Sequence, residues 1–531
     1  MTCTHTLSDL LDRGLVAQLR GDASVAFGDV RHDSRCIRPG EIFAAMPGLN
    51  YDGASYAADA IRRGAVAILC QSALELAAPQ AICPNVRIAL GEVARLVQGD
   101  PCASLAVVGV TGTNGKTTIS YLIESVVRAA GACPALTGTV SFRGPQGEVE
   151  ATHTTPMADD FMRFARAAVD AGATHLVTEV SSHALAQHRV DAIPFEVAAF
   201  INLSQDHLDY HHDLERYRGA KARLFLELEP AQAVFNVDDE FGAELASRAG
   251  MPVLRCSKRA GTRADVRALS WRADRRGTTA SVDTPQGKLE LASPLIGDYN
   301  LDNLLVSVGC CLALGFTLDQ ISSGIRSMSG VPGRLERITL GRQEDARHSL
   351  VVVDYAHTPD ALARVLAALR KVTSGRLWVV FGAGGERDSA KRPVMGRLAA
   401  DLADVLVLTS DNPRREPPEE ILAQIETGVR QAGKSPLAEA GPWLSGYTVC
   451  EDRRSAIRTA ITHAGPEDAV LIAGKGHETV QVIGSERRPF DDRSEARRAL
   501  AADTNPASEV DPAVEVDPAV EVDPAVEVDK A

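Results

Sequence analysis

A glycine-rich loop that could hold the phosphates of a nucleoside triphosphate lies in the segment GVTGTNGKTT, residues 109–118. Glycines allow backbone N–H groups to close around phosphate oxygens, and a helix that begins here adds the positive end of its dipole. Lys116 can neutralise the β- and γ-phosphates, and the hydroxyl of Thr117 can bind Mg²⁺. Val110 stands where the strict GxxxxGK(S/T) pattern has its first glycine, so the match is one residue short. We expect the nucleotide to contact Gly112, Thr113, Asn114, Gly115, Lys116, Thr117 and Thr118.

A carboxylate and an imidazole follow two later apolar segments of strand length. Glu179 ends one of these segments, and His207 follows the next one along the chain. Because parallel strands bring their carboxyl ends to one edge of a sheet, both side chains should lie near the phosphate loop, where they could hold a second Mg²⁺. His207 and His211 also have the spacing of a zinc pair on a helix, but no HExxH glutamate accompanies them. We therefore favour magnesium over zinc, and we expect His211 and His212 to be exposed to solvent.

These residues need a sheet whose strand ends meet, and the pattern of apolar segments predicts one. Between residues 102 and 334, apolar runs of strand length alternate with helical stretches, which indicates a mostly parallel sheet covered by helices. The first helix should run from residue 119 to 130 and stop at Gly131. Another α/β unit follows the region that ends near residue 334. We expect strands at residues 105–110, 176–180, 197–202, 233–236, 350–353, 377–381, 405–408 and 469–472, after shorter apolar runs at 41–46 and 65–70.

Length and composition narrow the class of protein. The chain has 531 residues, enough for three or four domains of about 150 residues, with 45% hydrophobic and 24% charged residues. Its net charge of −14 argues against a general binder of nucleic acid or anionic membranes. No apolar stretch approaches the length of a membrane span, and residues 1–15 lack the pattern of a signal peptide. The ten cysteines include no CxxC pair, which favours reduced thiols in the cytoplasm over disulfides or a zinc site.

A repeated acidic segment ends the sequence. From Glu509 the sequence repeats EVDPAV three times and then ends EVDKA. Residues 509–531 hold eight acidic residues and one lysine, a net charge of −7, so half of the excess negative charge lies here. A proline every six residues and the lack of aromatic residues predict a disordered tail that cannot pack a core. We favour a solubilising or neutral extension over an interaction tail, so deletion of residues 505–531 should leave activity intact.

Ten motifs of the chain resemble, in the same order, those of the Mur ligase family. The resemblance covers roughly residues 30–495. Within the family, the chain resembles the members that add the third residue of the peptidoglycan stem peptide. It implies an α/β fold with an N-terminal UDP-binding domain at 1–101, a central ATP-binding domain with a P-loop ATPase-like parallel sheet at 102–335, a C-terminal Rossmann-like amino-acid-binding domain at 336–502, and a disordered tail at 503–531. The motifs are GTNGKTT, EVSSHALAQHR, DHLDYH, YRGAK, YNLDN, GRLE, DYAHTPDAL, FGAGGERDSAKRP, SDNPRREPP and AGKGHE.

The resemblance implies a ligase that uses ATP to form an amide bond. The carboxylate of UDP-N-acetylmuramoyl-L-alanyl-D-glutamate attacks the γ-phosphate, and the amine of meso-2,6-diaminopimelate then displaces phosphate from the acyl phosphate. Two anions must approach within about 3.5 Å, so Lys116 and two Mg²⁺ ions are needed between them. Lys221 is similar to a family lysine that CO₂ carbamylates, which turns a cation into a ligand for Mg²⁺. The implied catalytic residues are Lys116, Lys221 and His207, and the implied metal ligands are Thr117, Glu179, His207 and Lys221.

The resemblance also implies which residues bind the two larger substrates. Asn300 and Asn303 would face the adenine side of ATP, and Arg334 would face its phosphates. Asp354 would bind the ribose, whose hydroxyls suit a carboxylate at a strand end. The implied contacts of the muramoyl substrate are Ser34, Thr154, Thr155, Ser181, Gln187 and Arg189, while His32 and His153 depart from the family pattern.

The resemblance implies that residues of the third domain select the amino-acid substrate. Diaminopimelate differs from lysine by one extra carboxylate, with which the planar guanidinium of Arg414 can pair bidentately. Lysine would leave this guanidinium unpaired, which favours diaminopimelate by about 2 kcal/mol. The alternative is that Arg414 and Arg415 are surface charges of a loop. The implied diaminopimelate contacts are Arg387, Asp411, Asn412, Pro413, Arg414, Gly474 and Glu478.

Two other kinds of function could use parts of the same framework. The same framework could use L-lysine or belong to a folylpolyglutamate synthase, but the HDSR segment at 32–35 and the DNPR segment at 411–414 argue against both. A P-loop switch that hydrolyses ATP without joining anything would leave the motifs at 410–418 and 473–478 without a role. We therefore expect a monomeric cytoplasmic ligase of peptidoglycan precursor synthesis that binds no nucleic acid and inserts into no membrane.

Overall fold

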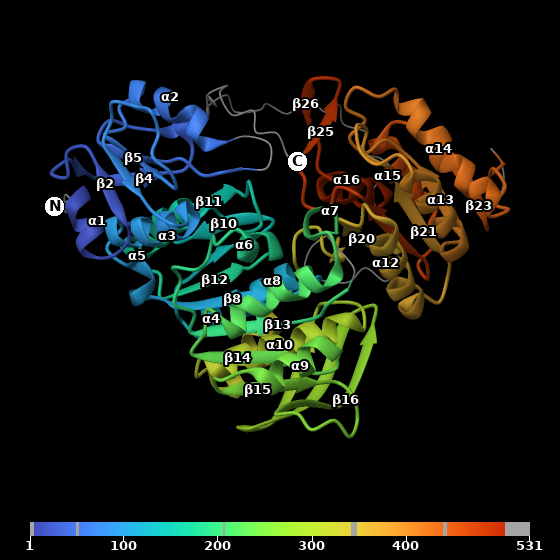
Figure 1. Ribbon diagram of the computed structural model, residues 1–531. Helices are drawn as coiled ribbons and strands as arrows, with labels where there is room; N and C mark the ends of the chain where they lie inside the picture. The colour runs from blue at the N-terminus through green and yellow to red at the C-terminus, as the bar shows by residue number, and fades with distance from the viewer. Residues whose placement is uncertain (1–4, 49–51, 205–207, 341–347, 439–442, 505–531) are drawn as a thin grey trace.

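Three large β-sheets with helices packed on them make up the chain (Figure 1). Figure 1 shows the computed structural model, which describes residues 5–48, 52–204, 208–340, 348–438 and 443–504. Strands and helices alternate along most of the chain, so the predicted α/β class is confirmed. In the view of Figure 1 the first sheet lies at the upper left, the third at the upper right and the central sheet below them.

The first sheet has five strands in the order β2-β7-β6-β5-β4. Strands β4 to β7 are parallel, and β2 runs antiparallel to β7. Phe43 and Ile68 pack in one core with α2, whereas Ile42 and Leu69 face the opposite core with α3. The elements are β1 (His5–Thr6), α1 (Leu7–Asp12), β2 (Gln18–Arg20), β3 (Ala26–Phe27), β4 (Asp29–Arg31), η1 (Ser34–Cys36), β5 (Glu41–Ala44), η2 (Gly53–Tyr56), α2 (Ala57–Arg62), β6 (Ala67–Cys70), β7 (Gln80–Ile82), α3 (Val86–Val97) and η3 (Pro101–Ser104).

The central sheet has eleven strands in the order β11-β10-β9-β12-β8-β13-β14-β15-β16-β17-β18. Strands β9, β12, β8, β13, β14 and β15 are parallel, so their carboxyl ends share one edge. The strands are β8 (Ala106–Thr111), β9 (Pro134–Thr137), β10 (Ser141–Gly144), β11 (Gly147–Glu150), β12 (His175–Glu179), β13 (Val197–Phe200), β14 (Gln232–Asn236), β15 (Val253–Ser257), β16 (Val266–Asp274), β17 (Gly277–Thr284) and β18 (Gly287–Ser293). The helices are α4 (Lys116–Ala129), α5 (Ala158–Asp170), α6 (Ser182–Ala186), α7 (Leu208–His211), α8 (Leu214–Leu226), α9 (Glu240–Arg248), α10 (Tyr299–Ala313) and α11 (Leu318–Ser327).

An antiparallel extension at one end of this sheet was absent from the sequence-based expectation. Strands β16, β17 and β18 pair antiparallel and form the end of the sheet at the bottom right of Figure 1. Tight turns that end in Gly277 and Gly287 connect them, and both glycines have positive φ. Two closely spaced runs separated by a glycine turn are a hairpin pattern, so these strands could have been found from the sequence.

The third sheet has six strands in the order β19-β20-β24-β21-β22-β23. All are parallel except β19, and buried aliphatic residues fill both faces, as expected where helices cover a parallel sheet. The strands are β19 (Glu336–Arg337), β20 (Leu350–Asp354), β21 (Leu377–Phe381), β22 (Val405–Leu408), β23 (Gly446–Val449) and β24 (Ala469–Ala473), followed by the separate hairpin β25 (Val480–Ile483) and β26 (Glu486–Pro489). The helices are α12 (Pro359–Val372), α13 (Lys391–Leu402), α14 (Pro418–Gln431), α15 (Arg453–His463) and α16 (Asp492–Thr504).

The first two sheets are joined by packed helices. Leu90 of α3 and Phe161 of α5 belong to one buried cluster that extends into both sheets. The segment 505–531, which holds the repeated acidic tail, lies outside the described residues. Within the described part of the chain, no helix has the length and apolar character needed to cross a bilayer.

Candidate active site

The glycine-rich loop lies at the carboxyl edge of the central sheet. Strand β8 ends at Thr111 and α4 begins at Lys116, so the loop fills the turn between them. The loop is anchored to the end of β13, because the Thr113 N–H donates to Asn202 O at 2.9 Å. The Asn114 N–H likewise donates to Asn202 Oδ1 at 2.9 Å. The local sequence therefore yields a strand, a loop and a helix N-terminus, which is the arrangement that holds phosphate groups.

Asn300 and Asn303, which were expected on the adenine side of ATP, begin α10 directly beside this loop. Asn303 Nδ2 donates to Asn300 Oδ1 at 2.8 Å, and Asn300 Nδ2 donates to Ile296 O at 2.7 Å. Gly115 has φ +92°, and a Cβ placed on it would lie 2.3 Å from Asn303 Oδ1. Only glycine fits this position, both for its backbone conformation and for the close approach of Asn303.

Two lysines from different helices meet at one carbonyl of the loop. Lys116 Nζ donates to Gly112 O at 2.8 Å and to Thr113 O at 3.0 Å. Lys221 Nζ, from α8, donates to the same Gly112 O at 2.9 Å and also lies 4.7 Å from the centre of the Tyr217 ring. Lys221 is buried, whereas Lys116 is partly exposed at the mouth of the loop. Lys116 and Lys221 are thus close to each other and to any phosphate held by the loop.

The carboxylate of Glu179 lies next to the helix that follows the loop. Thr117 Oγ1 donates to Glu179 Oε2 at 3.1 Å. Thr139 contributes two further hydrogen bonds, from its N–H to Glu179 Oε1 and from its Oγ1 to Glu179 Oε2, both at 2.9 Å. Thr139 was not among the residues expected in the site, although its place just after the β9 strand puts it at the same edge of the sheet. Threonine hydroxyls and a carboxylate form a cluster of oxygen atoms, the type of ligand that Mg²⁺ prefers.

The histidines of the DHLDYHH segment differ from expectation. His207, predicted as a catalytic residue and a metal ligand, lies outside the described residues. His211, predicted to be exposed, is only 5% exposed, and its Nε2 lies 2.9 Å from Ser182 Oγ. That prediction was wrong because α7 packs its aromatic residues against α6, where the His211 ring meets that of His183 at 5.5 Å. His212 is exposed, as predicted.

The residues expected to bind the muramoyl peptide form a strip that continues from Glu179. Thr155 Oγ1 donates to Glu179 O at 2.7 Å and accepts from the Ser181 N–H at 3.0 Å. Arg189 Nη1 donates to Thr155 O at 3.0 Å, and Arg189 Nη2 donates to Gln187 Oε1 at 2.7 Å. Burial, and then the positive charge of Arg87, lowers the pKa of Arg189 to about 10. Thr154 accepts from Thr139 Oγ1 at 3.1 Å, which completes the link between this strip and the loop.

The N-terminal residues expected to bind UDP belong to the first sheet and the segment that follows its β4 strand. Ser34 is buried in η1, and the hydrogen bonds among the described residues do not connect it with Thr155. His32 Nδ1 lies 2.8 Å from Asp159 Oδ1 of α5, so this histidine joins the first sheet to a helix of the central sheet. His153 is exposed.

Arg334 and Asp354 lie where the chain enters the third sheet. Asp354 is buried at the end of β20, and its carboxylate accepts from the N–H groups of Leu335 at 2.7 Å and Ala356 at 2.8 Å. Burial raises the pKa of Asp354, and the charge of Arg334 opposes that rise. The guanidinium of Arg334 lies 5.0 Å from the centre of the Tyr355 ring, and its buried Nε has no hydrogen-bond partner among the described residues. An unpartnered guanidinium N–H is suited to an anionic ligand such as phosphate.

The loops after β22 and β24 bring most of the expected amino-acid contacts together. Asn412 Nδ2 donates to Glu478 Oε2 at 2.9 Å. Arg414 is half-buried with φ +51°, and its Nη1 donates to Gly385 O at 2.8 Å, so it is not a free surface charge. A Cβ on Gly474 would lie 2.3 Å from Asp411 Oδ2, which again requires glycine. Pro413 is buried between Asn412 and Arg414, whereas Arg387 is exposed at the edge of the group.

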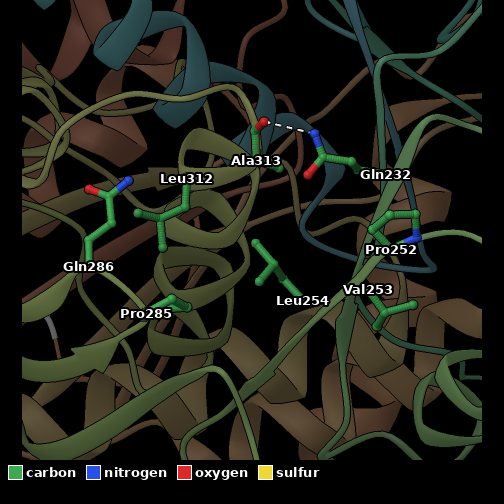
Figure 2. A pocket seen from close by; sticks show the side chains of 8 residues that line it. All are labelled: Gln232, Pro252, Val253, Leu254, Pro285, Gln286, Leu312 and Ala313. Atoms are coloured by element: carbon green, nitrogen blue, oxygen red, sulfur yellow. Dashed lines mark hydrogen bonds between the residues drawn. The ribbon is translucent and has the colours of Figure 1, made fainter.

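A pocket of about 220 Å³ lies elsewhere, at the opposite edge of the central sheet (Figure 2). Gln232 and Val253, the first residues of β14 and β15, line it, and Gln232 Nε2 donates to Ala313 O at 3.0 Å. None of the described residues that line this pocket is charged, so it offers no cationic side chain to a phosphate group. The phosphate loop, rather than this pocket, marks the functional edge of the sheet.

Comparison with known protein families shows to which class of enzyme this site belongs. The Mur ligase middle domain matches residues 110–311, the glutamate ligase domain of Mur ligases matches residues 333–476, and the catalytic domain of the Mur ligase family matches residues 28–98. The chain belongs to the Mur ligase family. The resemblance found in the ten motifs is therefore confirmed, and this Mur ligase is an ATP-dependent enzyme that forms an amide bond.

Similar proteins cover nearly all of this Mur ligase. A protein of Trichormus variabilis, named UDP-N-acetylmuramoyl-L-alanyl-D-glutamate–2,6-diaminopimelate ligase, is 44% identical over 478 residues, which are 89% of this chain and 93% of that protein. A solved structure with the same name is 34% identical, with a TM-score of 0.69 over 94% of this chain and 99% of that chain. MurF ligase from Thermotoga maritima in complex with ADP shares the fold at 19% identity, with a TM-score of 0.55 over 89% of this chain and 96% of that one. The predicted Mur ligase architecture is confirmed.

Proposed function

We propose that this Mur ligase joins meso-2,6-diaminopimelate to the D-glutamate carboxylate of UDP-N-acetylmuramoyl-L-alanyl-D-glutamate. ATP would be converted to ADP and phosphate, and the product would be a UDP-linked tripeptide precursor of peptidoglycan. Relatives that are 41–44% identical carry the name 2,6-diaminopimelate ligase, which supports this assignment. The observation that carries the proposal is the meeting of the loops after β22 and β24, where Asn412 binds Glu478 and the nearby Arg414 directs its guanidinium to Gly385 O. The enzyme would act as a monomer in the cytoplasm on soluble substrates.

The phosphate loop would bring the two reacting anions together. We propose that Gly112 to Thr118 hold the triphosphate and that Arg334 approaches it from the third sheet. The substrate carboxylate would attack the γ-phosphorus, which forms an acyl phosphate and releases ADP. Lys116 would offset the charge that accumulates on the transferred phosphoryl group. The amino group of the second substrate would then attack the acyl carbon, lose a proton and expel phosphate.

Magnesium fits the oxygen atoms beside the loop. Thr117 Oγ1 and Glu179 Oε2 lie 3.1 Å apart. Neighbouring ligands of an octahedral ion with bonds of about 2.0–2.1 Å are separated by roughly 3 Å, so both can bind one Mg²⁺. We propose that Thr117, Glu179, His207 and Lys221 hold two ions. Bound Mg²⁺ supplies positive charge to the transferring phosphoryl group.

We propose that Lys221 works as its carbamate. The ammonium would lose one proton, and the free amine would then add to CO₂ and lose a second proton, so that an N–C bond forms and an anion replaces the cation. Lys221 is 1% exposed and its Nζ already lies 2.9 Å from Gly112 O, so the new carboxylate would lie at the phosphate loop. An anion there needs a cation partner, which the two Mg²⁺ ions would provide.

The remaining residues would bind the muramoyl peptide and select the amino acid. We propose that Ser34, Thr155, Ser181 and Arg189 bind the UDP-muramoyl-dipeptide, together with Thr154 and Gln187. Arg414 would pair with the extra carboxylate of diaminopimelate, with Arg387, Asp411, Pro413 and Gly474 shaping the same site. Because these groups belong to three sheets, the domains we assign to residues 1–101, 102–335 and 336–502 would have to close around the substrates.

The proposal is tested by product mass and phosphate release. The enzyme is supplied with ATP, Mg²⁺ and UDP-N-acetylmuramoyl-L-alanyl-D-glutamate, and then with meso-diaminopimelate, L-lysine or no amino acid. We expect a UDP-tripeptide only with diaminopimelate. A lysine product would overturn the role of Arg414 and keep the ligase, whereas phosphate release without a joined product would point to an ATPase switch.

A further inference from the structure

A buried lysine lies behind the amino-acid loops and has no role in the proposal above. The side chain of Lys475 is 0% exposed and follows the carboxyl end of β24. Its Nζ donates to Asn412 Oδ1 at 3.0 Å, to Glu478 Oε2 at 3.1 Å and to Val480 O at 2.6 Å. A lysine ammonium has three protons, so each of them has an acceptor. Lys475 therefore ties the loop after β22 to the loop after β24.

This lysine sets the orientation of the Asn412 amide. Asn412 Oδ1 accepts from Lys475 Nζ and from the Val482 N–H at 3.0 Å, while Nδ2 donates to Glu478 Oε2 at 2.9 Å. An amide can turn by 180° and exchange its oxygen for its nitrogen unless hydrogen bonds select one orientation. Here the two donors fix the oxygen, and one proton on Nδ2 is left without an acceptor among the described residues.

Lys475 also sets which oxygen of Glu478 is available. Glu478 Oε2 receives hydrogen bonds from Lys475 and Asn412, whereas Oε1 accepts none from the described residues. The Glu478 side chain is 31% exposed and that of Lys475 is fully buried, so the carboxylate stands between the lysine and the open site. A substrate would touch Glu478 and would not touch Lys475.

We propose that Lys475 is a positioning residue for the amino-acid substrate, which it serves by fixing the Asn412 amide and the Glu478 carboxylate. The inference rests on the proposed function, because it concerns the same amino-acid site. Glu478 Oε1 can accept from a substrate ammonium, and the remaining Nδ2 proton of Asn412 can donate to a substrate carboxylate. Without Lys475, Asn412 can turn its oxygen to the site and Glu478 loses the cation that holds it. Both changes weaken recognition of the amino acid and leave ATP binding alone.

The test is Lys475→Met, which keeps most of the length of the side chain and removes its three donors. KM and kcat are measured for ATP, for the UDP-substrate and for the amino acid. We expect KM for the amino acid to rise at least about tenfold, because losing a group that orients ligands commonly has effects of this size. The preference for diaminopimelate over L-lysine should fall, and KM for ATP should stay within about twofold. An unchanged KM for the amino acid, or an equal rise of all three KM values, would overturn the proposal.

Arg376→Met is the matched control for a general loss of stability. Arg376 lies at the amino end of β21, at the other edge of the same sheet, and pairs with the buried Asp468 at 2.7 Å. Its removal should lower the melting temperature as Lys475→Met does, without a selective change in KM for the amino acid. A selective rise of that KM in Arg376→Met would attribute the effect to loosened structure and would overturn the role of Lys475.

A double-mutant cycle shows whether Lys475 acts through Glu478. In Glu478→Gln the acceptor is already altered, so adding Lys475→Met should raise KM for the amino acid little further. Independent, multiplying effects would contradict the inference. If the wild-type enzyme joins L-lysine instead, the proposed amino-acid substrate is wrong. The KM values of wild type and Lys475→Met for lysine then still test the role of Lys475. If it joins no amino acid, both proposals fail.

Discussion

Lys116 and Lys221 reach the same carbonyl oxygen, that of Gly112, from two different helices. Two ammonium groups that converge on one loop repel each other unless anions lie nearby. The triphosphate supplies such anions at Lys116, and carbamylation would remove the positive charge at Lys221. The two lysines therefore have different proposed roles, and each role has its own test.

The first prediction concerns Lys116. The substitution Lys116→Met removes the charge at the phosphate loop and keeps most of the side-chain length. We expect kcat to fall by about 10²–10³, as when one group that stabilises transition-state charge is lost. The rate of phosphate release at saturating substrate concentrations measures kcat, and the melting temperature is the control for folding. A kcat within about twofold of wild type would remove Lys116 from the mechanism.

The second prediction concerns the carbamate of Lys221. A carbamate loses CO₂ reversibly, so enzyme held in buffer freed of CO₂ should lose most of its activity and regain it when bicarbonate is added. Lys221→Met should be inactive under both conditions. Carbon-13 NMR with labelled bicarbonate should give one carbamate signal in wild type that the variant lacks. Full activity without CO₂ would show that Lys221 acts as the free amine.

The third prediction concerns Arg414. Arg414→Lys keeps the charge and removes the planar fork, so KM for diaminopimelate should rise by about tenfold or more. Arg415→Lys is the matched control, because Arg415 is the exposed neighbour in the same loop. Steady-state kinetics of both variants make the comparison. Equal KM values for the two variants would mean that no carboxylate pairs with Arg414.

At the scale of elements, the site depends on how α4 begins. Gly115 caps this helix in a left-handed conformation and carries no Cβ that would collide with Asn303. Gly131, just beyond the other end of α4, has φ +79°, and no atom of the described residues lies within 4 Å of its Cβ position. The two glycines share one type of backbone conformation and differ in their surroundings, so they form a natural pair for comparison.

The fourth prediction uses this pair. Gly131→Ala should lower the free energy of unfolding by about 1 kcal/mol through backbone strain alone, with activity unchanged. Gly115→Ala adds the collision with Asn303, so it should be less stable than Gly131→Ala and at least about tenfold less active, because the phosphate loop must shift. Denaturant unfolding and phosphate release measure the two effects. Equal activity in both variants would show that the loop tolerates the shift.

At the scale of the whole molecule, charged residues join the first sheet to the central one. His32 and the Asp159 carboxylate of α5 are 2.8 Å apart, and Arg163 Nη2 donates to Asp159 at 2.6 Å and its Nη1 to Val30 O at 2.9 Å. Burial by itself lowers the pKa of His32, but the hydrogen bond and charge of Asp159, with Asp160 and Asp33, outweigh burial and raise it. This contact ties the predicted UDP-binding region to the ATP-binding sheet.

The fifth prediction is a pH dependence of that contact. The pKa of His32 is raised above its ordinary value of 6.5, so its ion pair with Asp159 stabilises the folded state fully below that pH and is lost as the pH rises through the raised value. His32→Gln should therefore be less stable than wild type by about 2 kcal/mol at pH 6 and by less at pH 9. Melting curves at both pH values test this. A difference that does not change with pH would mean that His32 is uncharged in the pair.

Much of the fold could be predicted because it depends on local pattern. The eight strands expected in the second and third sheets are all present, since continuous apolar runs between polar loops are typical of buried parallel strands. The helix expected from residue 119 begins at Lys116, because the polar residues Lys116 to Thr118 form its first turn at the phosphate loop. The antiparallel strands β16 to β18 were missed, although their glycine turns could have been noticed.

Some features of the candidate site follow from the local sequence, and others depend on contacts between segments far apart in the chain. The phosphate loop was recognised from ten consecutive residues, because strand, glycine turn and helix start are encoded by neighbours in sequence. The burial of His211, the bonds of Thr139 to Glu179 and the position of Lys475 behind Glu478 could not be foreseen. Each depends on which strand ends and helices lie side by side, and segments far apart in the chain meet only once the sheets have formed and packed. Residue types therefore told us which chemistry is possible, and packing determined which side chains share it.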